Sequence, residues 1–226
     1  MALDDIQHLL NREPQSASLH FEKGSICLRS GDTICALNAF NTATEYDTQN
    51  PANWSALGLV QLMLDRQDDA LTSLSQSIEN GSKWAGDYIN RGIIFYRRHN
   101  YRSALADYDK AVTLSPNDAQ CYYNRGVLRQ ELGDYNRALD DLTQAINLSP
   151  DQIEIYYQRG IVQLQLRQWE DAISDFQTIM QRYPYFLPAY YLAAQAHTSL
   201  GNGKTAFQLR QQAYDLEQKK DSIQAQ

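Results

Sequence analysis

Apolar residues follow a 34-residue period along most of the chain, and within each period they lie three and four positions apart. This spacing places them on one face of an α-helix. Each period holds two such segments separated by turn residues such as Gly133 and Asp134. The pattern therefore predicts two helices per period. A small residue marks each period, at Gly24, Gly58, Gly92, Gly126, Gly160 and Ala194.

Bulky residues stand at fixed distances from these small ones. Four positions before each, the chain has His20, Trp54, Tyr88, Tyr122, Tyr156 and Tyr190. Sixteen positions after each, it has Phe40, Leu74, Tyr108, Leu142, Phe176 and Arg210. A small residue at a crossing allows two helices to approach closely, and a bulky neighbour fills the remaining space. We therefore expect each period to be a closely packed helix pair.

The segment from Tyr122 to Gly126, followed by Ala138, Ala145 and Pro150, resembles the tetratricopeptide repeat. The resemblance covers residues 17–220. It implies an all-α fold, a right-handed superhelical α-solenoid of antiparallel helix pairs. Because no pair could bury its apolar face alone, we expect stability to come from the stacking of neighbouring pairs.

The same frame predicts how the chain is divided. It gives six repeats, at 17–50, 51–84, 85–118, 119–152, 153–186 and 187–220. Residues 1–16 continue the frame backwards, because Ile6 lies 34 positions before Phe40. We interpret them as a capping helix, the second helix of an incomplete repeat, or as the remnant of a longer array. Residues 221–226 are expected to form a polar C-terminal tail.

Composition and charge exclude several kinds of partner. The net charge is −7 and the isoelectric point about 5.0, so the chain lacks the positive surface that binds phosphates, and we expect no nucleic acid partner. No run of eighteen apolar residues occurs, and the first residues do not form a basic start followed by an apolar run. We therefore expect neither a membrane span nor an export signal.

The cysteines indicate a compartment. Cys27, Cys35 and Cys121 are odd in number and lie on repeating helical positions. We interpret them as small buried thiols of a reducing compartment. The expected location is the cytoplasm, although a trimmed signal stays possible.

Motifs for catalysis, cofactors and metals are missing from the sequence. The segment from Gly201 to Thr205 ends like a phosphate-binding loop, but Thr198 stands where the first glycine is needed, and the segment links two predicted helices. The four histidines are scattered over different repeats, and no paired-cysteine or His-Glu-x-x-His spacing occurs. We expect no enzyme, no cofactor and no metal site.

The resemblance implies a concave surface lined by the first helix of each repeat, a shape that suits an extended peptide or a helix of another protein. Tyrosines stand on this face three positions before the small residue, and tyrosine is enriched at interfaces. Side-chain amides stand one position later, where they can pair with a peptide backbone. The predicted peptide-binding residues are Ile89, Asn90, Tyr123, Asn124, Tyr157, Gln158 and Tyr191. The alternative is that such residues only pack between neighbouring first helices.

Arginine and aspartate occur together in three of the repeats. Directly before the small residue stand Arg91, Arg125 and Arg159, and sixteen positions after each arginine stand Asp107, Asp141 and Asp175. The other three repeats lack both residues. We hypothesise that each arginine pairs with the aspartate of its own repeat and joins the two helices.

These observations favour a non-enzymatic scaffold or adaptor that binds a segment of another protein. Two alternatives remain: a structural array that assembles with copies of itself as a homo-oligomer, and the interaction region of a larger enzyme or complex. The carboxylate clamp by which some members of the family hold chaperone tails is disfavoured. The positions that should be basic are Phe21, Ser55, Gln120 and Gln158.

Overall fold

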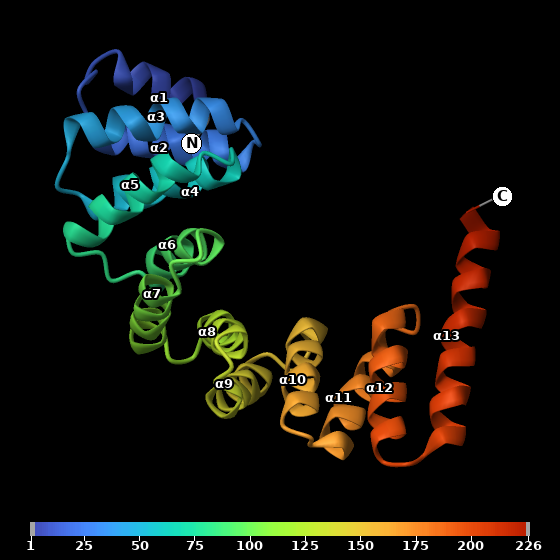
Figure 1. The fold of residues 1–226 in the computed structure, drawn as a ribbon. Coiled ribbons are helices and arrows are strands. Elements are labelled where there is room, and N and C mark those ends of the chain that lie inside the picture. Colours follow the sequence, from blue (N-terminus) through green and yellow to red (C-terminus); the bar gives the residue numbers. More distant parts are fainter. Residues whose placement is uncertain (1–2, 225–226) are drawn as a thin grey trace. The chain divides into compact units, whose positions relative to one another are not determined.

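The computed structural model describes residues 3–224, and in them it contains thirteen α-helices and no strand (Figure 1). The helices are α1 (Leu3–Leu10), α2 (Ala17–Arg29), α3 (Thr33–Tyr46), α4 (Pro51–Met63), α5 (Gln67–Glu79), α6 (Ala85–Arg97), α7 (Tyr101–Leu114), α8 (Ala119–Glu131), α9 (Tyr135–Leu148), α10 (Ile153–Gln165), α11 (Trp169–Arg182), α12 (Leu187–Ser199) and α13 (Gly203–Gln224). The expected all-α fold of paired helices is confirmed.

The turn between the two helices of a pair has a similar backbone conformation in all six pairs. Its second residue has φ between +55° and +82°, and these residues are Gly31, Asp65, His99, Gly133, Arg167 and Gly201. This left-handed region favours glycine. The residue after it caps the next helix in three turns, as where the Asp134 carboxylate accepts a hydrogen bond from the backbone N–H of Arg137. Turn chemistry therefore fixes where the second helix of a pair begins.

The small residue of each period lies at a close helix crossing, as predicted. A Cβ atom at Gly160 would lie 2.7 Å from ring atoms of Phe176, and one at Gly92 would lie 2.6 Å from the ring of Tyr108. Both distances are too short for a real contact. Glycine is therefore required here for space, because the aromatic ring of the second helix lies directly against the backbone of the first.

The hypothesis of arginine–aspartate pairs is confirmed at all three places: Arg91 with Asp107, Arg125 with Asp141, and Arg159 with Asp175. In each pair, Nε and Nη2 donate to the two carboxylate oxygens over 2.6–2.9 Å. Asp141 also accepts a hydrogen bond of 2.8 Å from Arg129. Burial raises the pKa of Asp175, and the guanidinium of Arg159 opposes this rise. The pairs join the first and second helix of their repeats.

The chain divides into two compact units, residues 1–116 and 117–226. In the first unit, Phe40 of α3 packs with Cys27 of α2 and with Leu57 and Val60 of α4. Helix α1 packs on α2, since Ile6 is fully buried and the Lys23 ammonium donates to Gln7 over 3.1 Å. The first unit is thus built by contacts between helices that follow each other along the chain.

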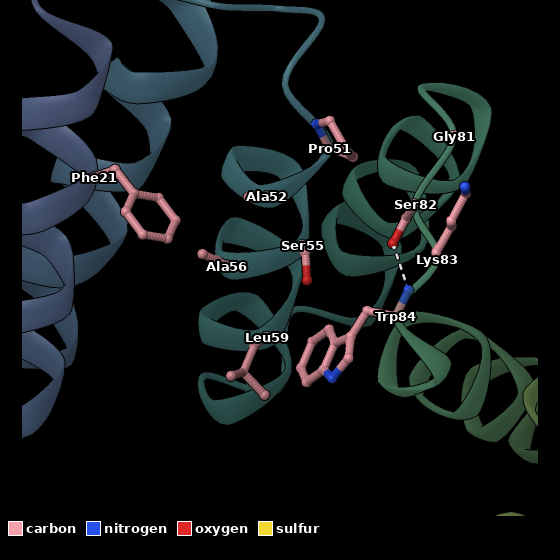
Figure 2. A pocket seen from close by; sticks show the side chains of 10 residues that line it. All are labelled: Phe21, Pro51, Ala52, Ser55, Ala56, Leu59, Gly81, Ser82, Lys83 and Trp84. Carbon is pink, nitrogen blue, oxygen red and sulfur yellow. Dashed lines mark hydrogen bonds between the residues drawn. The ribbon is translucent and has the colours of Figure 1, made fainter. Parts of the chain in front are cut away.

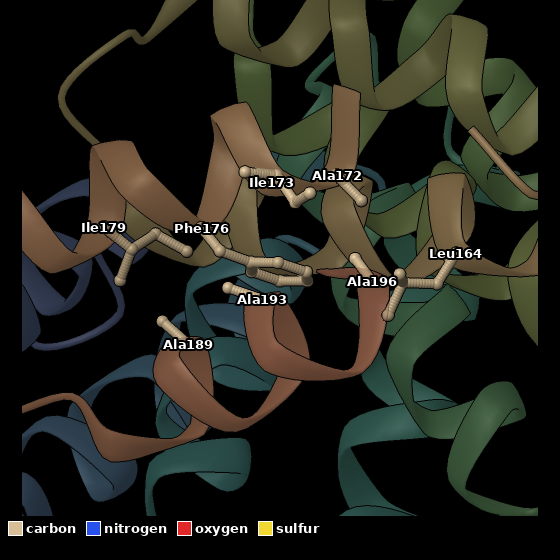
Figure 3. Close-up of a cluster of buried hydrophobic side chains, with 8 residues drawn as sticks. All are labelled: Leu164, Ala172, Ile173, Phe176, Ile179, Ala189, Ala193 and Ala196. Atoms are coloured by element: carbon tan, nitrogen blue, oxygen red, sulfur yellow. The ribbon is translucent and has the colours of Figure 1, made fainter. Parts of the chain in front are cut away.

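In the second unit, a cluster of buried apolar side chains joins α10, α11 and α12 (Figure 3). Phe176 of α11 is fully buried and faces alanines of α12, namely Ala189, Ala193 and Ala196. Alanines on this face let α12 pack closely on α11. Helix α13 is helical to Gln224 and so includes most of the segment expected as a tail. Residues 225–226 of that tail, and Met1 and Ala2 of the expected cap, lie outside the described residues.

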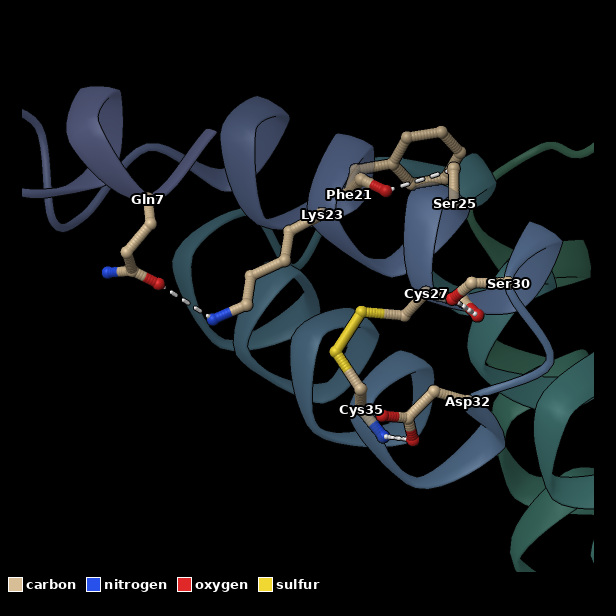
Figure 4. Close-up of a disulfide and its surroundings, with 8 residues drawn as sticks. All are labelled: Gln7, Phe21, Lys23, Ser25, Cys27, Ser30, Asp32 and Cys35. Carbon is tan, nitrogen blue, oxygen red and sulfur yellow. Dashed lines mark hydrogen bonds between the residues drawn. A yellow bond between two sulfur atoms is a disulfide. The ribbon is translucent and has the colours of Figure 1, made fainter. Parts of the chain in front are cut away.

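The interpretation of the cysteines as three separate thiols is wrong for two of them. Cys27 and Cys35 form a disulfide that joins α2 to α3, and their Cα atoms lie 5.7 Å apart (Figure 4). This separation falls within the usual disulfide range. The short turn between the two helices brings together residues eight apart in sequence. Cys121 is a free and buried thiol, as expected.

Candidate functional site

Three first helices of the second unit carry most of the predicted peptide-binding residues. Tyr123 lies on α8 and Gln158 on α10, and both are partly buried. Burial raises the pKa of the Tyr123 phenol, the charge of Glu154 adds to this rise, and the Gln158 side chain opposes it. Tyr123 of one helix pair therefore lies within hydrogen-bonding reach of Gln158 of the next.

Asn124 lies beside Tyr123 on α8 and is only half satisfied. Its Oδ1 accepts a hydrogen bond of 3.1 Å from Nε2 of Gln120. Its Nδ2 is buried and has no hydrogen-bond partner within residues 3–224. A buried donor without an acceptor costs about 1–3 kcal/mol. The site therefore contains an amide donor, Asn124 Nδ2, whose pairing with an acceptor would lower the free energy of the protein.

The tyrosines of this surface differ in exposure. Tyr157 is partly buried, and its ring meets the Phe186 ring edge-on at a centroid distance of 5.3 Å. Tyr191 of α12 is 45% exposed. Phe186 directly precedes α12, so a residue at the start of one helix pair packs against Tyr157 of the pair before it. Tyr191 is the predicted residue with most free surface.

The remaining two predicted residues lie on α6 of the first unit. Ile89 is 7% exposed and takes the packing role that the sequence left open. Asn90 is partly exposed and keeps an amide available at the surface.

The first unit contains a pocket that was not predicted from the sequence (Figure 2). It has a volume of about 580 Å³ and lies between α2, α4 and the turn from α5 to α6. Its lining residues are Phe21, Pro51, Ala52, Ser55, Ala56, Leu59, Gly81, Ser82, Lys83 and Trp84. Its signal in the sequence was two small residues, Ser55 and Ala56, at positions that carry larger side chains in most other repeats.

A buried carboxylate lies below this pocket. Asp87 is fully buried and accepts hydrogen bonds from the hydroxyls of Ser55, Ser77 and Ser82 over 2.6–2.7 Å. Two of these serines also line the pocket. The network therefore ties the pocket floor on α4 to the start of α6.

Other candidate chemistry has no support in the described part of the chain. Across residues 3–224, no three histidine, cysteine, aspartate or glutamate side chains are grouped so that they could hold a metal ion. The phosphate-loop lookalike forms the turn between α12 and α13, which begins at Gly203. No described helix has both the length and the apolar character to cross a membrane.

Two family models for the tetratricopeptide repeat match the chain, one at residues 91–152 and the other at residues 123–185. They agree with the paired helices and with the glycine crossings described above. The chain is a tetratricopeptide repeat protein. Proteins with tetratricopeptide repeats are, in general, scaffolds for protein interactions.

This tetratricopeptide repeat protein is similar in sequence to the protein STIP1 homolog of Dictyostelium discoideum. The two are 24% identical over 111 residues, which is 49% of this chain and 20% of that relative. The match thus spans about a fifth of the length of the curated relative.

Several solved structures share the fold. YrrB, described as a tetratricopeptide repeat protein with an unusual peptide-binding site, superposes with a TM-score of 0.75 at 21% identity and covers 80% of this chain and 93% of its own. PilF of Pseudomonas aeruginosa has a TM-score of 0.72 at 18% identity and covers 91% of this chain and 93% of its own. At these identities the likeness is one of fold.

Proposed function

We propose that this tetratricopeptide repeat protein is a non-enzymatic adaptor that binds an extended peptide segment of another protein. In the second unit the peptide lies along α8, α10 and α12, in contact with Tyr123, Asn124, Tyr157, Gln158 and Tyr191. In the first unit Asn90 offers a further amide to a peptide backbone, and Ile89 supports it from within. Cytoplasmic location is not part of the proposal, because a disulfide is typical of an oxidising compartment.

The unpaired amide of Asn124 is the observation that carries the proposal. Its Nδ2 is buried without an acceptor in the described residues, and Tyr123 and Gln158 lie at the same surface. A peptide carbonyl that reaches this donor after a small side-chain rotation removes the cost of leaving it unpaired. Gln158 can pair with the backbone in the same manner, since an amide both donates and accepts. Recognition of this kind depends on backbone groups more than on one side-chain sequence.

The test is selection of peptides from a random displayed library on the full chain, followed by affinity measurements with purified variants. We expect Tyr191→Ala to weaken the selected peptides about tenfold, which is typical for an aromatic contact residue. Tyr214→Ala is the matched control, because Tyr214 is 53% exposed on α13 and is not one of the proposed residues. Asn124→Ala should weaken binding without lowering the melting temperature. Equal affinities for wild type, Tyr191→Ala and Asn124→Ala would show that the peptides bind elsewhere.

Self-assembly is a second candidate, favoured by the surface of α13. Phe207 is 67% exposed and Tyr214 is 53% exposed, and their spacing of seven residues puts them on one face of the helix. Such a face can cover the same face of a second copy. Sedimentation velocity over a range of concentrations tests this candidate, with Phe207→Ser as the variant that should stay monomeric. A mass that does not change with concentration excludes it.

A further inference from the structure

The pocket in the first unit lies where the repeat pattern lacks a bulky side chain. Three positions before the small residue, the repeats carry Phe21, Ser55, Ile89, Tyr123, Tyr157 and Tyr191. Only the second repeat has a small residue at this position. The next position, which carries Asn90, Asn124, Gln158 and Leu192 in the later repeats, is Ala56 in the second. The pocket therefore replaces the volume of a side chain that four of the other five repeats fill with a ring.

Aromatic and aliphatic side chains form the walls of this gap. Phe21 reaches in from α2, Leu59 lies on α4, and Trp84 closes the side toward α6 (Figure 2). The indole of Trp84 lies close to the first turn of α6. A Cβ atom at Gly86 would be only 2.8 Å from two of the ring atoms of Trp84. Glycine at this position thus lets the indole lie over the helix. Trp84 remains 53% exposed and offers its ring to whatever enters.

The floor is held by a network of side-chain hydrogen bonds. Ser55 is 7% exposed, and its hydroxyl donates to the buried Asp87 carboxylate over 2.6 Å. Ser77 and Ser82 donate to the same carboxylate. With three hydroxyl donors, Asp87 has most of its hydrogen-bonding capacity taken up from within the protein. The floor therefore presents the small side chain of Ser55 to the pocket.

The rim carries one positive charge. Lys83 is exposed and has no ion-pair partner among the described residues, although acidic residues outnumber basic ones in the chain as a whole. An ammonium group beside an apolar pocket is complementary to a carboxylate that accompanies an apolar group. The charge of Lys83 therefore favours peptides that carry a carboxylate next to the apolar side chain that fills the pocket.

We propose that this pocket receives one bulky apolar side chain, preferably aromatic, from a partner peptide that has an acidic residue next to it. The inference rests on the proposed function, because it assumes that the chain binds peptides. The volume of about 580 Å³ lies within the range of ligand pockets. A phenylalanine, tyrosine or tryptophan side chain can bury about 150–250 Å² in such a place. Lys83 pairs with the acidic neighbour at the rim.

The test uses the full chain and the capped dipeptide acetyl-Asp-Phe-amide as the probe. Trp84 reports occupancy through its indole N–H signal in two-dimensional NMR, with the signals of Trp54 and Trp169 as internal references. We expect the probe to shift the Trp84 signal only. Acetyl-Asp-Ala-amide should bind about tenfold more weakly or worse, because it buries almost no apolar surface. Lys83→Ala should weaken the phenylalanine probe and remove most of its salt dependence.

Ala56→Leu fills the pocket, and Leu192 at the same position of the sixth repeat indicates that the helix accepts this side chain. The matched control is Ala106→Leu, which places the same side chain on an exposed position of α7. We expect Ala56→Leu to abolish the Trp84 shift and Ala106→Leu to leave it unchanged, both at wild-type helicity. Should Ala56→Leu fail to fold, Phe21→Ala removes a wall and should weaken the probe about tenfold.

Three results would overturn the inference. The first is a Trp84 signal that the probe does not shift, and the second is equal binding by Ala56→Leu and wild type. The third is a Trp84 signal that moves with protein concentration alone, which assigns the pocket to a second copy. Failure here is distinct from failure of the proposed function. If the selected library peptides lose affinity for Tyr191→Ala but contain no aromatic residue, the proposed function holds and the pocket inference fails. If the dipeptide probe binds but the library yields no peptide, the pocket inference holds and the proposed function fails.

Discussion

Asp141 accepts hydrogen bonds from two arginines, Arg125 of the same helix pair and Arg129 one turn further along α8. Its side chain is 4% exposed, and those of the arginines are 14% and 17% exposed. Removal of one partner from a buried ion pair costs about 3–5 kcal/mol. We expect Asp141→Ala to lower the free energy of unfolding by about this amount, because it leaves two guanidinium groups without their carboxylate.

Removal of Arg125 should cost less than removal of Asp141. Arg129 still donates to Asp141 in the Arg125→Ala variant, so the carboxylate keeps a positive partner. The loss is then that of charged hydrogen bonds, about 1.5–3 kcal/mol. This order distinguishes a shared carboxylate from a simple pair, for which either substitution would cost the same.

Urea titrations followed by circular dichroism, and fitted with a nearest-neighbour model of helix-pair stacking, give the free energies of wild type, both single variants and the double variant. We expect a coupling energy between Arg125 and Asp141 of about 1.5 kcal/mol or more. Arg66 and Asp69 are the control pair, because they are joined over 2.7 Å but are 50% and 48% exposed, and their coupling should stay below about 1 kcal/mol. A coupling below about 0.5 kcal/mol at Arg125 and Asp141 would refute the reasoning.

Three further predictions concern glycine and cysteine. Gly160→Ala should destabilise the protein by about 1–3 kcal/mol through the clash with a buried ring, whereas Gly133→Ala, at φ +78° in open space, should cost about 1 kcal/mol from backbone strain alone, as measured by urea unfolding. Burial raises the pKa of the Cys121 thiol from 9.0 to about 11, so its contribution to stability is complete below pH 9.0 and is lost as the pH rises through about 11. Wild type should therefore lose more stability than Cys121→Ala over this interval in thermal melts. Denatured protein should show one reactive thiol without reductant and three with it, and reduction of the bond between Cys27 and Cys35 should cost about 2–3 kcal/mol for a loop of this length. Three thiols before reduction would contradict the disulfide.

The sequence predicted the paired helices because the packing rule repeats every 34 residues. The arginine–aspartate pairs could be found in the same way, since both residues appear or disappear together from repeat to repeat. Ile89 shows the limit of this reasoning, because its position on a helix does not reveal whether a neighbouring helix covers it. The same sequence pattern is compatible with contact between Ile89 and a peptide and with the burial of Ile89 that the structure shows.

The disulfide and the pocket were missed for different physical reasons. Whether Cys27 and Cys35 join depends on the distance between two helix ends, and an odd number of cysteines argued against a bond. The pocket depends on small side chains at Ser55 and Ala56 and on the direction of the Trp84 ring. Repeat patterns reveal the side chains that are present, but empty space appears only when the surrounding chain is folded.

The close succession of contacts along the chain has a consequence for its synthesis. Within each unit, a helix packs mainly against the helices before and after it, so a new helix pair can stack on the preceding pair and lacks only the pair that follows it. At about 5–20 residues per second, 34 residues emerge in roughly two to seven seconds. Helices form in microseconds. Each pair can therefore fold on the nascent chain before the next one leaves the exit tunnel, and the growing protein exposes little more than one unstacked pair to chaperones at any time.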